Sequence, residues 1–358
     1  MSSDFVDAVA IKIEEAKVTK KLIVFTISST AKLESEPYLT PLREFDQFCV
    51  LGCVLFSQTV LFELITLVDG VVDVILVDAE KKVPLQLCDD SAAPLDAVTI
   101  GNFETSNFSK ICFMQVELSK VFEYKPNDLT VNAAWMFLSQ KLHFFTGKKI
   151  CILGFGNIGT KLALKLVECG ADVHVYSKEY YKTHLITQAL NFIKPVGTIA
   201  SITCHRDPLS ATFSSDVLIG ATNGVPIITV DIIKSLRKKC LILDLGKNNL
   251  YQAAVVYANS CGLEICRTDV TSSIESFVSE TLSLDDTLQN TYGEWRFENC
   301  VCVSGGYFGE AGAIVVDNYK SPKLIYGICD GFGSLKKEYD EKDKLNISWI
   351  KEEFECDL

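Results

Sequence analysis

The segment KKICILGFGNIGTKLALKLVECGADVHVYSKEYYK, residues 148–182, decides the fold of this chain. An apolar run at 150–153 leads into glycines 154, 156 and 159, spaced as G-x-G-x-x-G. A run of helical length follows, and then a second apolar run, ADVHVYS, at 171–177. A strand, a glycine turn, a helix and a second strand form the unit that binds dinucleotides, so the segment predicts such a site.

Each glycine of the turn has a separate physical task. Gly154 allows the tight turn, Gly156 lets the backbone approach a pyrophosphate, and Gly159 lets helix and strand pack closely. The helix that follows presents its N-terminus to the phosphate charge. We therefore assign five residues to cofactor binding: Gly154, Gly156, Asn157, Ile158 and Gly159.

The end of the second strand selects the cofactor. NAD-binding proteins place Asp or Glu there to bind the ribose hydroxyls. This strand ends instead on Ser177 and Lys178, with Glu179 next along the chain. A hydroxyl and a cation suit a 2′-phosphate, so the sequence favours NADP over NAD, and Ser177 and Lys178 join the cofactor site.

Further apolar runs follow at a spacing that alternates strand and helix. The candidate strands are KICILGF at 149–155, ADVHVYS at 171–177, SDVLIGAT at 215–222, CLILDLG at 240–246 and LEICRTDV at 263–270. Strands alternating with segments of helical length indicate an α/β fold with a doubly wound parallel sheet of the Rossmann type. Its ligands bind at the carboxyl ends of the strands.

A second α/β domain precedes this sheet. LIVFTI at 22–27 and VDVILVD at 72–78 indicate buried parallel strands, and the apolar run at 50–68 is interpreted as a buried helix. A helix at 126–142, with Asp128 as its N-cap, bridges the two domains.

We expect three parts in all. Residues 1–127 form a substrate or cap domain, and residues 128–305 form the NAD(P)-binding domain. Residues 306–358 form a C-terminal extension that completes the sheet or returns to the first domain.

Composition excludes several classes of protein. With a net charge of -12 and a pI near 4.9, the chain lacks the basic face that nucleic acid requires. Gln58 and Glu63 interrupt the most apolar run, which argues against a membrane partner. The 14 cysteines lack zinc spacing, and we expect Cys300 and Cys302 on alternate faces of a strand. Without a basic-then-apolar leader, we expect a cytoplasmic protein with reduced cysteines and no metal site.

Several motifs resemble the formate/glycerate dehydrogenase-like group, which includes the D-2-hydroxyacid dehydrogenases, and also the dipicolinate synthase A-subunit type of reductase. They are NDLTVNAAWMFL, GKKICILGFGNIG, SSDVLIGATNG, LRKKCLILDLG and YANSCGLEI. The resemblance covers about residues 128–270 and implies a Rossmann domain, dehydrogenase chemistry and a homodimer. GFGNIG is also similar to amino-acid dehydrogenases of the glutamate/leucine kind.

The catalytic residues of the hydroxyacid dehydrogenases do not carry over. Where that family has a substrate-binding arginine, this chain reads D-L-G-K-N-N, with Asp244, Gly246 and Lys247. The four histidines stand at 143, 174, 184 and 205, so the late histidine of the family's acid–base pair is missing.

Two loops at strand ends offer replacements for that pair. Lys247 can bind a carboxylate or act as a general acid, while Asn223 and Asn248 can orient a carbonyl. Thr222 joins Asn223 beside the nicotinamide. The alternatives are a plain turn at Asn223-Gly224 and a solvated loop lysine.

Other candidates lie further along the chain. Arg267 is a candidate for binding a substrate carboxylate, with Asp269 as its supporting partner; an internal ion pair is the alternative. Tyr307 and Glu310, in the glycine-rich stretch 304–313, are further candidate proton donors, although a structural hairpin explains them equally well.

Three functions fit these residues. The first is an oxidoreductase that moves hydride between NADP, or NAD, and a C=O or C=N carbon of a small carboxylated substrate. The second is a hydrolase or lyase that keeps NAD tightly bound. The third is a sensor or scaffold that binds the dinucleotide without catalysis. We favour the first.

Overall fold

The computed structural model describes residues 2–29, 36–56, 58–80, 108–222 and 224–355. The chain divides into two compact units, Met1–Glu275 and Ser276–Leu358, and each is described by itself.

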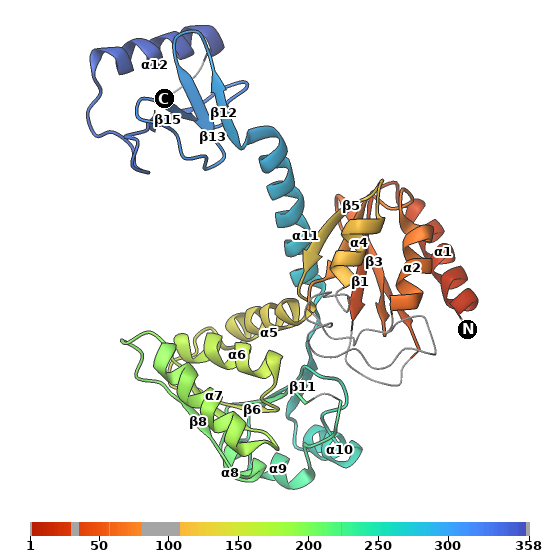
Figure 1. The fold of residues 1–358 in the computed structure, drawn as a ribbon. Helices are drawn as coiled ribbons and strands as arrows, with labels where there is room; N and C mark the ends of the chain where they lie inside the picture. Colours follow the sequence, from red (N-terminus) through yellow and green to blue (C-terminus); the bar gives the residue numbers. More distant parts are fainter. Residues whose placement is uncertain (1, 30–35, 57, 81–107, 223, 356–358) are drawn as a thin grey trace, which may run out of the picture. The chain divides into compact units, whose positions relative to one another are not determined.

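The N-terminal sheet has the strand order β2-β3-β1-β4-β5. Figure 1 labels its strands β1, β3 and β5 together with the helices α1, α2 and α4. Its strands are β1 (Leu22–Ser29), β2 (Tyr38–Glu44), β3 (Phe48–Leu55), β4 (Val74–Asp78) and β5 (Lys120–Tyr124). All pairings are parallel except that of β2 with β3. Its helices are α1 (Ser2–Lys17), α2 (Gln58–Val68) and α4 (Phe108–Gln115), and all three contribute to one apolar core with β1, β3 and β4. A mostly parallel sheet with helices therefore precedes the Rossmann sheet, within the same compact unit.

We expected the apolar run at 50–68 to form one helix, and this prediction was wrong. Its first part belongs to β3, and α2 begins at Gln58. Continuous apolar residues suit a strand buried on both faces as well as a buried helix, so periodicity alone does not separate them.

The bridging helix is α5 (Pro126–Leu142), as predicted, but its N-cap is Lys125 rather than Asp128. Pro126 occupies the first turn, where its missing N–H leaves no bond unmade. The carboxylate of Asp128 instead pairs with Lys161.

The second sheet has the strand order β11-β10-β9-β6-β7-β8, and all its pairings are parallel. Its strands are β6 (Lys149–Leu153), β7 (Asp172–Tyr176), β8 (Ile202–Cys204), β9 (Val217–Gly220), β10 (Leu241–Asp244) and β11 (Glu264–Arg267). This is the order of a doubly wound Rossmann fold, in which the strand order reverses at the β6–β9 pair while the strands stay parallel.

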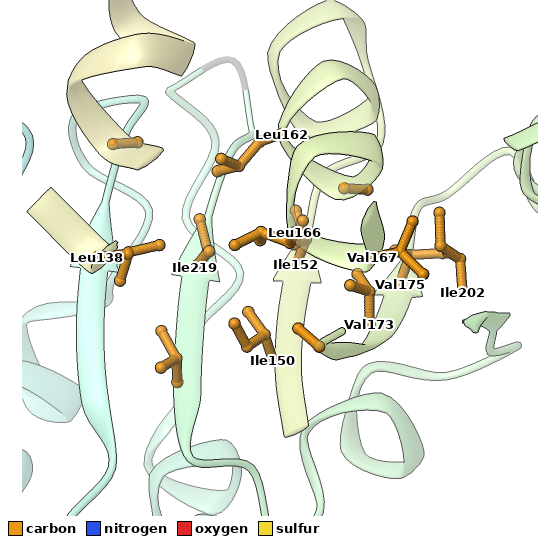
Figure 2. Packing of buried hydrophobic residues seen from close by; sticks show 14 of the residues in the cluster. Leu138, Ile150, Ile152, Leu162, Leu166, Val167, Val173, Val175, Ile202 and Ile219 are labelled. Atoms are coloured by element: carbon orange, nitrogen blue, oxygen red, sulfur yellow. The ribbon is translucent and has the colours of Figure 1, made fainter. Parts of the chain in front are cut away.

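Helices cover both faces of this sheet. They are α6 (Asn157–Glu168), α7 (Tyr180–Ile193), α8 (Pro208–Thr212), α9 (Val230–Ser235) and α10 (Gln252–Ser260). Figure 2 shows Ile150, Ile152 and Val173 of the sheet with Leu162 and Leu166 of α6, in the core that α5, α6 and α7 share. Alternate strand residues form a second core with α8, α9 and α10, as the two-residue period of a strand requires.

The C-terminal unit has a sheet of its own. This unit begins at Ser276, whereas we predicted a boundary at 305/306. Its elements are β12 (Gly293–Arg296), β13 (Val301–Ser304), β14 (Ile314–Val316), β15 (Ile325–Ile328) and α12 (Glu341–Phe354), preceded by α11 (Thr271–Asp286) and a short π-helical turn, Thr287–Thr291. Because β13 pairs with β12 and β14, it belongs to this unit and not to the Rossmann sheet.

Cys300 and Cys302 both enter the core of the C-terminal unit, so their expected placement on alternate faces was wrong. Residues two apart in a strand share a face. Among the described residues every cysteine is a free thiol, and most are buried, whereas Cys169 and Cys261 are exposed. In that part of the chain, no helix combines the length and apolar character that crossing a bilayer requires.

Candidate functional site

The glycine turn joins β6 to α6 in a conformation that only glycine adopts easily at its first position. Gly154 has a φ of 102°, and a Cβ added to it would lie 2.5 Å from the carbonyl carbon of Ala221. Its N–H donates to the carbonyl oxygen of Tyr176 at 2.9 Å. The turn is thereby fixed against both neighbouring strands, β7 and β9.

The other two glycines have opposite surroundings. A Cβ added to Gly156 meets nothing within 4 Å, whereas one added to Gly159 would overlap the carbonyl oxygen of Gly154. Gly156 is also the N-cap of α6 and offers no side chain to the free N–H groups of the helix. Open space in front of free N–H groups is what a pyrophosphate requires, and the tight space at Gly159 is what helix–strand packing requires.

A cavity of about 330 Å³ lies in front of this turn. Five of the predicted cofactor residues line it: Gly154, Gly156, Ser177, Lys178 and Thr222. Asn157, Ile158 and Gly159 form the first turn of α6 beside it. Phe155, Pro226 and Ile227 contribute apolar surface, so the residues present fit a dinucleotide that has flat rings and a charged centre.

The end of β7 carries the groups that would meet the adenosine ribose. Ser177 is half-buried, Lys178 is exposed, and the Glu179 carboxylate pairs with Lys182 at 3.3 Å. Arg206, which follows β8, stacks on the ring of Tyr180 at 4.6 Å from its centroid. Arg206 is a cation near this corner of the sheet that sequence reasoning missed, because β8 has only three residues and gave no strand signal.

A buried polar chain connects the carboxyl ends of β9 and β10. The backbone N–H of Thr222 donates to Oδ1 of Asn249 at 2.9 Å, and the Thr222 hydroxyl also contacts this oxygen. Nδ2 of Asn249 donates to the Asp244 carboxylate. Asn249 is fully buried and Asp244 nearly so, and a buried polar group is stable only when hydrogen-bonded, as these are.

A second cavity, of about 290 Å³, lies at the carboxyl ends of β10 and β11. Asp244, Asn248 and Arg267 line it. Nη2 of Arg267 lies 3.7 Å from Oδ2 of Asp244, and the Arg267 side chain is 61% exposed. Asp269 is not the partner of Arg267 as expected; its carboxylate accepts hydrogen bonds from the backbone N–H and hydroxyl of Thr271, which lowers its pKa.

The remaining predicted residues have different surroundings. Lys247 and Asn248 are exposed and both adopt the left-handed region, with φ of 59° and 60°. Asn223 lies outside the described residues. Tyr307 and Glu310 belong to the C-terminal unit, where Tyr307 packs edge-on against Tyr292 and Glu310 lines a cavity of about 420 Å³.

Asn249 and Asp244 are the site residues that the sequence did not identify. In D-L-G-K-N-N the two asparagines look equivalent, and only the left-handed turn at Lys247 and Asn248 sends Asn249 inward. Among the described residues, no group of His, Cys, Asp and Glu is arranged to hold a metal ion.

Comparisons with known proteins agree with this geometry. A family described as putative NAD(P)-binding matches residues 142–246. The probable multifunctional siroheme biosynthesis protein HemA of Ruminiclostridium josui is 27% identical over 194 residues, which are 53% of this chain and 35% of that protein. The chain thus spans about a third of the length of this relative.

Solved structures also match the chain at low identity. A shikimate dehydrogenase in complex with NADP+ is 14% identical, with a TM-score of 0.39, over 70% of this chain and 85% of that one. The dipicolinate synthase A-subunit of Bacillus halodurans is 13% identical, with a TM-score of 0.34, over 73% and 97%. The cofactor assignment rests instead on the strand order, the glycine turn and the matching family. Residues 142–246 thus carry an NAD(P)-binding domain of the Rossmann type.

Proposed function

We propose that this chain is an oxidoreductase that transfers hydride between NADP, in preference to NAD, and a C=O or C=N carbon of a small carboxylated substrate. One observation carries the proposal: the cofactor cavity and a second cavity containing an arginine lie at the same edge of one sheet. The buried chain Thr222–Asn249–Asp244 connects them. A dehydrogenase needs such an arrangement, because cofactor and substrate must meet in a fixed orientation.

The residues of the second cavity suit a substrate with a carboxylate. The exposed guanidinium of Arg267 can bind it through two parallel hydrogen bonds. Bound NADPH would supply the hydride, and the protein has to position the substrate and manage one proton. We assign this proton to the carboxylate of Asp244, with Lys247 as the alternative, and we propose that Asn223 and Asn248 orient the substrate.

An imine suits this site better than a ketone. A ketone accepts hydride at carbon and a proton at oxygen, so it needs an acid beside it. A protonated imine already carries its proton, and its positive charge is stabilised by a carboxylate such as that of Asp244. We therefore place cyclic imino acids before 2-oxo acids as substrates.

The first experiment titrates the purified chain with NADPH and NADH, followed by nicotinamide fluorescence, and then measures NADPH oxidation with cyclic imino acids and 2-oxo acids. Binding without turnover on this panel would favour the sensor or scaffold. NAD that survives purification and is not consumed would favour the hydrolase or lyase.

Replacing the guanidinium tests the substrate site directly. We expect Arg267→Gln to raise KM for the substrate about 30-fold with little change in kcat, because a charge-assisted pair is lost from binding. Arg237→Gln is the matched control, since Arg237 also pairs with an aspartate, Asp216, in this sheet but lines neither cavity. Equal changes in both variants would remove Arg267 from the substrate site.

The setting of the enzyme also follows from the proposal. Free thiols throughout the described residues support a reducing compartment, the cytoplasm. The homodimer rests on the resemblance to two-domain dehydrogenases, and sedimentation equilibrium of the full chain tests it.

A further inference from the structure

We propose that Asn249 is a positioning residue, whose amide holds the Thr222 backbone at the cofactor cavity in register with Asp244 at the second cavity. The inference deepens the proposed function and rests on it. Asn249 itself lines neither cavity, so it acts through the two residues that do.

The side-chain amide of Asn249 fits its place in one orientation. Its oxygen faces the Thr222 N–H, and its nitrogen faces a carboxylate oxygen of Asp244. Turning the amide over would place N–H against N–H and oxygen against oxygen. The two partners therefore require a group with an acceptor on one side and a donor on the other, which asparagine supplies.

Two glycines make room for this side chain. A Cβ added to Gly220 would lie 2.6 Å from Cβ of Asn249, and one added to Gly246 would lie 2.9 Å from its Nδ2. Gly220 ends β9 and Gly246 follows β10, and Asn249 connects the loops after these two strands. The space left by the missing side chains of Gly220 and Gly246 thus holds the Asn249 amide between the loops of β9 and β10.

The backbone of Asn249 continues the connection. Its carbonyl oxygen accepts hydrogen bonds from the N–H groups of Ile227 at 2.9 Å and Ile228 at 3.0 Å. Ile227 lines the cofactor cavity. Movement of the β10 loop would therefore displace both ends of the segment between Thr222 and Ile227, and with it one wall of the cofactor cavity.

The test replaces the donor half of the amide and leaves the acceptor half. In Asn249→Asp, the new carboxylate still has an acceptor for the Thr222 N–H, but it faces the Asp244 carboxylate, and repulsion between the two charges moves it away from that N–H. Two adjacent carboxylates raise the pKa of one of them, so at low pH they share a proton that restores the missing donor. Nη2 of Arg267 lies 3.7 Å from the Asp244 carboxylate, and Lys247 of the same loop is exposed.

We expect the NADPH dissociation constant of Asn249→Asp, divided by that of the wild-type chain at the same pH, to be about tenfold at pH 8 and near one at pH 5. Taking the ratio removes the titration of the NADPH 2′-phosphate. The double variant Asp244→Asn with Asn249→Asp restores one donor and one carboxylate, and should recover most of the affinity at pH 8.

Asn191→Asp is the matched control. The Asn191 amide likewise donates to the carbonyl oxygen of Ile202 and accepts from its N–H. It lies beside β8, at the edge of the sheet, and lines neither cavity. Its NADPH ratio should stay near one at both pH values. A ratio for Asn249→Asp that does not change with pH would overturn the proposal. An equal loss of NADPH affinity in Asn191→Asp, or unfolding of Asn249→Asp at pH 8, would also overturn it.

A second readout does not depend on the cofactor. Hydrogen exchange at the Thr222 amide, measured in the cofactor-free chain at pH 8, should be faster in Asn249→Asp and unchanged in Asn191→Asp. If the wild-type chain binds neither NADPH nor NADH, the proposed function fails. Unchanged Thr222 exchange in Asn249→Asp refutes the positioning role on its own.

Discussion

His174 and His205 share a hydrogen bond between their rings, with Nδ1 of His174 2.7 Å from Nε2 of His205. The rings stack with their centroids 5.0 Å apart. Such a bond needs one ring nitrogen to donate and the other to accept, which two neutral imidazoles supply. Two fully protonated rings have only donors, so the contact requires at least one neutral histidine.

We predict that this pair weakens the fold in acid. Burial, Lys149 and the neighbouring His205 lower the pKa of His174 to about 4, and burial and Lys149 lower that of His205, with Asp172 and Asp207 acting in the opposite direction. A lowered histidine pKa means that the unfolded chain binds more protons. The free energy of unfolding is therefore highest above pH 6.5 and falls as the pH drops toward 4.

Thermal unfolding of matched variants measures this contribution. Between pH 7 and pH 4.5 the melting temperature of His174→Gln should fall less than that of the wild-type chain, because one group that gains a proton on unfolding is gone. His184→Gln, on the exposed side of α7, should fall as the wild type does. An equal fall in all three chains would contradict the assignment.

Two glycines of the cofactor turn, Gly156 and Gly159, should respond differently to the same added methyl group. Gly156→Ala places the methyl in open space, so we expect an unchanged melting temperature and NADPH affinity about tenfold lower. Gly159→Ala forces helix and strand apart and should lower stability by about 2 kcal/mol. Gly197→Ala, whose methyl also meets nothing, should change neither quantity. Calorimetry and fluorescence titration distinguish the three variants. Loss of NADPH binding in Gly197→Ala would contradict the assignment of Gly156 to the pyrophosphate site, because a methyl group elsewhere would then have the same effect.

Cofactor preference should reverse when charge at the end of β7 is reversed. In Ser177→Asp with Lys178→Ala, a carboxylate replaces the hydroxyl and cation, so NADPH binding should fall at least tenfold while NADH binding is retained or improved. Arg206→Ala should weaken NADPH more than NADH if its guanidinium also meets the 2′-phosphate. Titration of each variant with both nucleotides measures the ratio, and a wild-type preference for NADH would show that the phosphate argument is wrong.

Much of the fold follows from short-range patterns in the sequence. The glycines at 154, 156 and 159 constrain a turn that few structures satisfy, and the buried positions of the neighbouring strands β6, β7 and β9 are apolar. Topology then follows because right-handed crossovers leave few ways to arrange parallel strands. The predicted strands of the Rossmann sheet are all present.

Two of the missed strands, β2 and β8, lie at sheet edges and were missed for a physical reason. Tyr38–Glu44 contains Pro41, and its pairing with β3 shifts register between Thr40 and Arg43. Proline and irregular pairing are tolerated at the edge of a sheet, where one side of the strand has no partner, and there the alternating pattern is lost. The three residues of β8 are too few to show any period.

The polar site depends on contacts that no local pattern encodes. Asn249 is buried because Gly220, 29 positions earlier, lacks a side chain, and Asp244 is satisfied by Asn249 rather than by a sequence neighbour on β10. The sequence predicted Lys247 as a carboxylate-binding residue or general acid, yet its backbone is left-handed and its side chain is exposed to solvent. A sequence motif identifies the residues of a loop, but the direction of each side chain is set by the backbone turn.

The strand order places the ribose end of the cofactor cavity and the second cavity on different halves of the Rossmann domain, whereas the other wall of the cofactor cavity, from Ala221 to Ile227, follows β9. Strands β6 to β8 supply the ribose corner, whereas β9 to β11 supply Arg267, Asp244 and Asn249. The halves meet where β6 and β9 pair, and the chain crosses between them once. On the proposed function, the groups that select the 2′-phosphate and those that bind the substrate carboxylate lie on separate contiguous stretches of the chain, so exchanging one stretch between homologous chains should change one preference more than the other.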